Sequence, residues 1–216
     1  MLNDYFIRCL SENLPYVPTD EQAELVARLA GFLWEDSVPS VFLLKGYAGT
    51  GKTSLVGALV KTLEAFERTC VLLAPTGRAA KVFASYAAHP AYTIHKKIYR
   101  QRTFTGDFSG FQLAHNAYKN TFFIVDEASM IANEPSEGSH YGSGLLLDDL
   151  FDFVYSGSGC RLILLGDTAQ LPPVGQERSP ALDESYLQRY GYPVYVSELT
   201  HVVRQDGDSG VLYNAT

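Results

Sequence analysis

The stretch GYAGTGKTS (46–54) constrains the fold of this chain most, because a loop of this pattern belongs between a strand and a helix. The apolar run VFLLK (41–45) precedes it, and a helical pattern over 52–66 follows it. Its glycines permit a tight turn that points successive backbone N–H groups inward at phosphate oxygens. The sequence therefore predicts a loop that holds the phosphates of a nucleotide. A glycine-rich turn with an incidental lysine is the disfavoured alternative.

The polar residues of this loop have chemical tasks in such a site. Lys52 is expected to reach the β- and γ-phosphates, and the Thr53 hydroxyl is expected to bind Mg²⁺. The helix that begins here adds the positive end of its dipole. ATP and Mg²⁺ are the expected cofactors, and no N/T-K-x-D motif for reading guanine is present. The predicted nucleotide contacts in the loop are Gly46, Gly49, Thr50, Gly51, Lys52, Thr53 and Ser54.

Short apolar runs alternate with helical patterns along the rest of the chain. Further predicted strands are CVLLA (70–74), TFFIV (121–125), RLILL (161–165) and VYVS (194–197). The predicted helices are 21–33, 52–66, 78–86 and 145–155. This alternation predicts an α/β fold, with a parallel sheet and helices on both of its faces.

Two segments do not fit the alternation. YRQRTFTGDFSGFQL (99–113) has two partly alternating arms around Thr105-Gly106-Asp107, which predicts a β-hairpin inserted between the second and third strands. NEPSEGSHYGSG (133–144) is rich in glycine and serine and is predicted to be a surface loop.

Two adjacent acids follow the third predicted strand, in FFIVDEASM (122–130). Asp126 can hold the Mg²⁺ shell, and Glu127 beside it can orient and deprotonate an attacking water. The alternative is a helix N-terminus, where the dipole favours acidic side chains. With the phosphate loop upstream, we favour the metal and base roles.

The stretch LILLGDTAQLPPVG (162–175) places Asp167 and Gln170 after another predicted strand. Both therefore belong on the carboxyl edge of the sheet, where ligands bind in such folds. A glutamine there can contact the γ-phosphate. A turn closed by two prolines is the structural alternative.

Charge is distributed unevenly along the chain. The net charge of −7 argues by itself against a nucleic-acid partner. Residues 78–119, called the basic stretch below, nevertheless hold seven basic residues and one acid, Asp107. The basic residues are Arg78, Lys81, Lys96, Lys97, Arg100, Arg102 and Lys119. This pattern is typical of a surface for a polyanion, and a solvated lysine-rich surface is an equal alternative.

Composition indicates a cytoplasmic protein that does not enter a membrane. With 216 residues, of which 46% are hydrophobic, the chain can bury the core of one large domain. No run approaches the roughly eighteen apolar residues of a membrane span, and the N-terminus lacks the pattern of a secretion signal. Its cysteines, Cys9, Cys70 and Cys160, lie far apart and are expected to be reduced, buried thiols.

Four landmarks occur in order: GYAGTGKTS, VDEAS, GDTAQLPPVG and LTHVVRQ (199–205). Together they resemble the first motor domain of superfamily 1 DNA helicases, in the RecD-like and Dda-like branch that moves 5′ to 3′. The similarity runs from about Pro18 to the end of the chain. It implies a RecA-like P-loop ATPase domain over 1–216, an ATP hydrolase of DNA repair or recombination.

The resemblance implies nucleotide contacts outside the phosphate loop. PTDEQ (18–22) is similar to the adenine-binding Q motif, with Gln22 as the reader, and a glutamine amide can pair with adenine N6 and N7. Taken alone, Gln22 is better explained as an exposed helix residue. Arg204 matches an arginine that stabilises charge on the γ-phosphate as it leaves, together with Lys52 and Gln170.

The resemblance also implies contacts to single-stranded or tailed duplex DNA. APTGRAAKVF (74–83) and TIHKKIY (93–99) are similar to motifs that touch the DNA backbone. The implied contacts are Pro75, Thr76, Gly77, Arg78, Thr93, His95 and Phe108. Phe108 lies in the hairpin, which with the residues up to 119 would form an inserted pin-like subdomain that stacks on bases.

Structural alternatives remain for three of these contacts. Thr76 can cap the helix that follows it, and His95 can be a buried structural group. The aromatic residues of the hairpin can simply fix it to the body.

Helicases of this kind have a second RecA-like domain, which the resemblance implies is missing from this chain. We therefore expect a C-terminally truncated motor that binds ATP weakly, hydrolyses it slowly and does not unwind DNA. The alternative function is a P-loop switch or regulatory ATPase with a protein partner. Stimulation of ATP hydrolysis by poly(dT) distinguishes the two.

Overall fold

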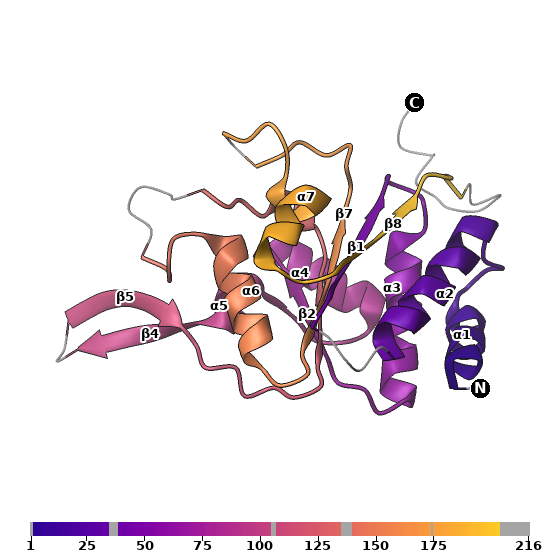
Figure 1. Cartoon of the computed structure of the whole chain (residues 1–216), viewed down its shortest axis with the longest axis horizontal. Coiled ribbons are helices and arrows are strands. Elements are labelled where there is room, and N and C mark those ends of the chain that lie inside the picture. The colour runs from indigo at the N-terminus through magenta and orange to yellow at the C-terminus, as the bar shows by residue number, and fades with distance from the viewer. Residues whose placement is uncertain (1, 35–38, 105–106, 135–139, 174, 204–216) are drawn as a thin grey trace.

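The computed structural model describes residues 2–34, 39–104, 107–134, 140–173 and 175–203, with the backbone alone for 102–104 and 107–109. Figure 1 shows a central sheet flanked by helices, with a two-stranded arm that extends from one side. The chain is thus an α/β domain with a small hairpin insertion, as the alternation of strands and helices predicts.

The central sheet is parallel throughout. Its strands lie in the order β3-β2-β6-β7-β1-β8, and every neighbouring pair is parallel. Their bounds are β1 Val41–Gly46, β2 Cys70–Ala74, β3 Ala91–Thr93, β6 Phe122–Val125, β7 Arg161–Gly166 and β8 Val194–Leu199. All carboxyl ends therefore meet at one edge, which brings together loops far apart in sequence.

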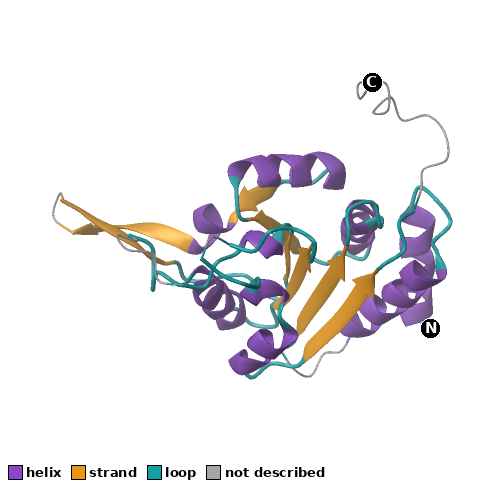
Figure 2. Cartoon of the chain, turned by 90° about the horizontal axis from the view of Figure 1, so that it is seen from above, coloured by secondary structure: helices purple, strands orange, loops and turns teal. Residues whose placement is uncertain are grey.

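Helices cover both faces of the sheet (Figures 1 and 2). One face carries α1 Leu2–Asn13, α2 Asp20–Trp34, α3 Lys52–Ala65 and α4 Gly77–Ala87. The other carries α5 Ile94–Ile98, α6 Leu146–Ser156 and α7 Glu184–Leu187. The alternation of β1 divides the core in two: Phe42 and Leu44 join the first cluster, and Val41 and Leu43 the second. Short 3₁₀ turns occupy Ala128–Met130, Pro180–Leu182 and Gln188–Tyr190.

The predicted hairpin is present as β4 Tyr99–Phe104 and β5 Asp107–Leu113. Its base is fixed to the body through Tyr99, whose hydroxyl donates to Asp149 at 2.6 Å, and through Phe111, whose ring stacks on Tyr141 at 4.5 Å. Two of the predicted turn residues, 105 and 106, lie outside the described residues. The wider boundary of 99–119 for an inserted subdomain stays a prediction.

Some features differ from the sequence expectations. Helix α1 and strand β3 were not expected; β3 is too short to show a period, and α1 has a mixed composition. Cys70 and Cys160 are free and buried as expected, but Cys9 is only half-buried. No helix in the described part of the chain is both long and apolar enough to cross a membrane.

Candidate nucleotide and DNA site

The phosphate loop joins β1 to α3 at the carboxyl edge of the sheet. Two of its glycines have left-handed backbone angles, with φ of +79° at Gly49 and +88° at Gly51. A Cβ atom on Gly51 would lie 2.4 Å from the Tyr16 hydroxyl and 2.5 Å from Nε2 of Gln22. The left-handed backbone favours glycine here, and a side chain would also displace the ends of Tyr16 and Gln22. Thr50 is buried, and its hydroxyl donates to the Tyr47 carbonyl at 2.9 Å.

Lys52 begins α3 and turns back over the loop. Its ammonium donates to the carbonyl oxygens of Gly46 and Tyr47, at 2.5 and 2.7 Å. Partial burial lowers the pKa of Lys52, and the nearby Asp167, Asp126 and Glu127 act against this shift. These acids come from two different loops, so the fold brings Lys52 and the predicted metal and base residues together. Thr53 is exposed and Ser54 half-buried.

Asp126 and Glu127 follow β6 at the same edge. The Asp126 amide continues the sheet pairing by donating to the Leu73 carbonyl at 3.0 Å. Glu127 has a φ of +54°, unusual for a residue with a side chain, and starts the 3₁₀ turn. The alternative was that the two acids begin a helix. In the structure only a three-residue 3₁₀ turn, Ala128–Met130, follows them.

The chemistry of these residues fits Mg²⁺. A threonine hydroxyl and a carboxylate, Thr53 and Asp126, are the hard oxygen ligands that this ion accepts. Mg²⁺ usually keeps several waters and takes other ligands from substrate phosphates, so a closed protein cage is unnecessary. No group of three or more His, Cys, Asp or Glu side chains suited to a metal occurs among the described residues.

The third motif connects to the second through one hydrogen bond. The Ser129 hydroxyl donates to Oε1 of Gln170 at 2.7 Å, and the Asp167 carboxylate accepts from the Ala169 amide at 2.8 Å. Asp167 is only 8% exposed, whereas Gln170 lies at the surface. The Gln170 amide donates to the Asp167 carbonyl at 3.3 Å, so a turn is present, and it holds both of these predicted residues before the prolines.

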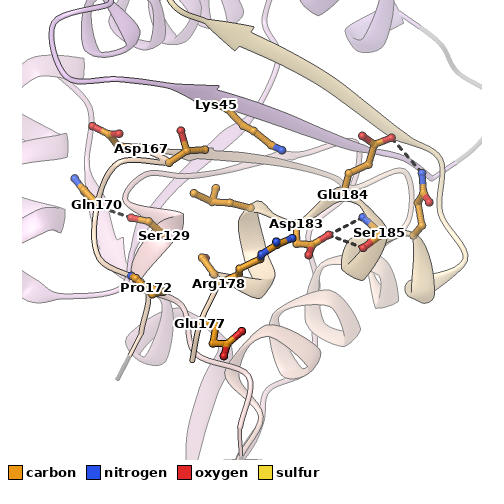
Figure 3. Close-up of a pocket in the computed structure, with 14 residues that line it drawn as sticks. Lys45, Ser129, Asp167, Gln170, Pro172, Glu177, Arg178, Asp183, Glu184 and Ser185 are labelled. Carbon is orange, nitrogen blue, oxygen red and sulfur yellow. Dashed lines mark hydrogen bonds between the residues drawn. The ribbon is translucent and has the colours of Figure 1, made fainter. Parts of the chain in front are cut away.

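A pocket of about 570 Å³ opens beside this motif, on the α7 side of the sheet (Figure 3). Lys45 reaches into it from the end of β1, and Arg178 from the segment before α7. Asp167 and Gln170 line its inner wall, but no residue of the phosphate loop does. The pocket therefore adjoins the predicted nucleotide site without containing it.

Gln22 lies at the start of α2 and is only 1% exposed. Its Nε2 donates to the Thr50 carbonyl at 3.0 Å, and its Oε1 accepts from the Thr19 amide at 3.1 Å. The exposed helix position that we weighed as an alternative is therefore wrong. In this structure the amide contacts the phosphate loop, and its adenine-reading role stays a prediction.

The predicted DNA contacts gather at the first turns of α4 and α5. Thr76, Gly77 and Arg78 are exposed, and Pro75 is half-buried. The Thr76 hydroxyl accepts from the Ala79 amide at 3.2 Å, so the capping alternative is realised and leaves the turn accessible.

The second set of predicted DNA contacts has a similar local role. Thr93 caps α5 by accepting from the Lys96 amide at 3.2 Å. His95 is half-buried against the rings of Tyr99 and Tyr141, and burial lowers its pKa, which favours a neutral imidazole. The side chain of Phe108 lies outside the described part of the chain.

Sequence reasoning missed the residue that holds the segment 199–203 against the site. The Glu21 carboxylate accepts from the amides of Thr200 and His201 at 3.0 and 3.1 Å, and from the Thr200 hydroxyl at 2.6 Å. The Val203 amide donates to the Gly49 carbonyl at 3.0 Å. The segment 199–203 is thereby held against the phosphate loop. The only sequence signal was the position of Glu21 beside Gln22. The predicted Arg204 lies just outside the described residues.

Comparisons with known proteins agree with this geometry. A model of AAA domains, AAA_30, matches residues 18–212. The ATP-dependent RecD2 DNA helicase of Deinococcus radiodurans is 31% identical over 160 residues, covering 72% of this chain and 18% of that protein. An uncharacterized protein of Acanthamoeba polyphaga mimivirus is 27% identical over 182 residues, covering 74% of this chain and 34% of that protein.

Solved structures show the same fold. The crystal structure of the Pif1 helicase from Candida albicans matches with a TM-score of 0.53 and 19% identity, covering 89% of this chain and 42% of that chain. This chain therefore spans less than half the length of each relative described here. The order of the motifs indicates a resemblance to RecD-like helicases. The match to the RecD2 helicase confirms it, as a distant relationship at 31% identity.

Proposed function

The chain belongs to the AAA_30 family of AAA domains, and we propose that it is the ATP-hydrolysing motor domain of a DNA helicase that moves 5′ to 3′. Its helicase-like P-loop ATPase fold is the starting point. The observation that carries the proposal is a groove of about 320 Å³ in which Asp126, Glu127 and Gln170 share a lining with Thr76 and Arg78. The predicted residues for hydrolysis and for DNA contact are thus direct neighbours.

In the proposed reaction, the phosphate loop binds the triphosphate with its inward N–H groups and the start of α3. Lys52 exchanges its bonds to the carbonyls of Gly46 and Tyr47 for bonds to phosphate oxygens. Thr53 and Asp126 would hold Mg²⁺, which neutralises developing phosphate charge when it is bound.

Glu127 takes the proton of the attacking water and holds that water in line with the γ-phosphate. Gln170, held by Ser129, contacts the γ-phosphate from the neighbouring loop. Arg204 completes the set in this proposal, because the segment that precedes it lies on the phosphate loop. Loss of the γ-phosphate then changes these contacts and alters the adjoining DNA groove.

In the proposed DNA contact, Thr76, Gly77 and Arg78 bind the backbone through side chains, an amide and the start of α4. Thr93 and His95 extend this surface along the basic stretch. Phe108 stacks on a base from the hairpin. A second RecA-like domain, which the helicase resemblance implies, would close over the nucleotide.

The test is the rate of ATP hydrolysis by the protein in its longest natural form, with and without poly(dT). We expect strong stimulation, because the DNA contacts and the hydrolysis residues line one groove. The variant Arg78→Ala should reduce that stimulation and leave the DNA-independent rate unchanged. Equal rates with and without poly(dT) would instead favour a regulatory ATPase that responds to a protein partner.

A further inference from the structure

One contact at the site involves a residue that no motif includes. Tyr86 lies on the last turn of α4, and its hydroxyl donates to Oδ2 of Asp126 at 2.5 Å. The predicted DNA contacts occupy the first turn of the same helix. The start of α4 therefore lines the groove together with Asp126, and its last turn reaches Asp126 through the Tyr86 hydroxyl.

The ring of Tyr86 is held firmly. It stacks on Phe83, one turn earlier, with centroids 5.2 Å apart and an angle of 25°. The Tyr86 carbonyl lies 3.2 Å from where a Cβ atom on Gly57 would stand, so the end of α4 packs closely on α3. Phe83 thus holds the ring and α3 holds the backbone beneath it, while the hydroxyl points at Asp126.

The phenol can only donate in this contact. A tyrosine hydroxyl keeps its proton at neutral pH, and an ionised carboxylate can only accept a hydrogen bond. A carboxylate oxygen that accepts this bond is fixed in place, and the second oxygen, Oδ1, is left for a metal or its water shell.

We propose that Tyr86 is a positioning residue for Asp126, and that through it α4 ties the predicted DNA-contacting turn to the metal-binding acid. The inference rests on the proposed role of Asp126 in holding Mg²⁺. Outer-shell partners of metal ligands orient those ligands, and their removal typically weakens metal affinity about 10- to 100-fold.

The test is the concentration of Mg²⁺ needed for half-maximal binding of a fluorescent, non-hydrolysable ATP analogue. We expect Tyr86→Phe to raise this midpoint about tenfold, while nucleotide binding without Mg²⁺ stays unchanged. Tyr155→Phe is the matched control, because it removes another phenol bond, to the Ser40 carbonyl at 2.8 Å, on the far side of the sheet. An unchanged midpoint in Tyr86→Phe overturns the proposal.

The proposed link through α4, from the DNA-contacting turn to Asp126, is tested by the effect of oligo(dT) on the same Mg²⁺ midpoint. Saturating oligo(dT) should lower the Mg²⁺ midpoint of the unmodified protein and of Tyr155→Phe, but not that of Tyr86→Phe. If oligo(dT) shifts all three equally, or shifts none, the link is overturned.

Asp126→Asn separates this inference from the proposed function. If that variant leaves the Mg²⁺ midpoint unchanged, the metal role of Asp126 is wrong and the inference falls with it. If Asp126→Asn changes the midpoint and Tyr86→Phe does not, only the inference falls.

Should Tyr86→Phe fail to fold, NMR of ¹³C-labelled tyrosine in the unmodified protein replaces it. The Tyr86 signal must then shift on addition of Mg²⁺ with nucleotide, and an unmoved signal overturns the proposal.

Discussion

Glu127 combines, at the scale of single residues, a left-handed backbone with the side chain of the proposed base. A φ of +54° is uncommon for any residue except glycine, and such conformations persist only where the surroundings impose them. Here β6 ends two residues earlier, at Val125, and a 3₁₀ turn with buried Ala128 and Ser129 follows at once. The turn presents Asp126 and Glu127 as neighbouring carboxylates in the groove rather than on opposite sides of an extended strand.

The variant Glu127→Gln tests the proposed base. It preserves size and removes the proton acceptor, so ATP binding should stay nearly unchanged while turnover falls at least about 100-fold, the usual contribution of a general base. Equilibrium binding of a fluorescent ATP analogue and steady-state hydrolysis measure the two effects. Hydrolysis within about threefold of the unmodified protein would show that another group takes the proton.

At the scale of elements, the first turn of α2 shows how one helix start can hold two segments that are distant in sequence. Its two adjacent residues hold two different segments: Gln22 binds the Thr50 carbonyl of the phosphate loop, and Glu21 binds the segment 199–203. Hydrogen bonds from the side chain of Thr200 and then from His201 lower the pKa of Glu21 to about 2. The start of α2 thus holds both the phosphate loop and the segment 199–203 at the predicted nucleotide site.

This attachment predicts a defined pH response. A carboxyl whose pKa is lowered by folding contributes stability above its unfolded value of 4.5, and that stability is lost as the pH falls through about 2. The Thr200 and His201 amides should therefore be protected from hydrogen exchange at neutral pH, and lose protection between those two values before the amides of β1 do.

The matched variants for this prediction are Glu21→Ala and Asp20→Ala. Glu21→Ala removes both oxygens that accept from Thr200 and His201, so protection there should already be lost at pH 7. Asp20, its exposed neighbour, makes no such contact, and its variant should retain protection. Equal protection in both variants at pH 7 would mean that Glu21 does not hold the segment.

An element can be predicted from the sequence when the residues that determine it lie within the element itself. The strands of the central sheet other than β3, and the helices α2, α3, α4 and α6, were expected near their observed bounds, because each carries its own apolar pattern. Strand β3 has three residues and exists only because β2 pairs with it. The contacts of Tyr86 and Glu21 join residues distant in sequence, which no local pattern encodes.

At the scale of the whole molecule, the net negative charge disfavours binding to DNA, whereas the local charge of the basic stretch favours it. The net charge is −7, but six of the seven basic residues of the basic stretch fall on α4, α5 and β4, and one of them, Arg78, lines the proposed DNA groove. Parts of it are structural: Lys97 lies over the rings of Tyr92 and Tyr118, at 4.7 and 4.8 Å from their centroids. Lys96 is exposed and better placed to meet a phosphate. An acidic body with a local basic surface should bind single-stranded DNA with a marked dependence on salt.

That dependence gives a quantitative expectation for Lys96→Ala. Each phosphate contact on a single strand contributes about 0.7 to the slope of log affinity against log salt concentration, so the slope should fall by about that amount. Lys61→Ala is the control, because Lys61 is equally exposed but lies three turns into α3, away from the carboxyl edge. Fluorescence anisotropy of a labelled dT oligomer between about 50 and 200 mM salt measures both slopes. Identical slopes in the two variants would mean that the basic stretch is a solvated surface, and that the DNA path crosses the molecule elsewhere.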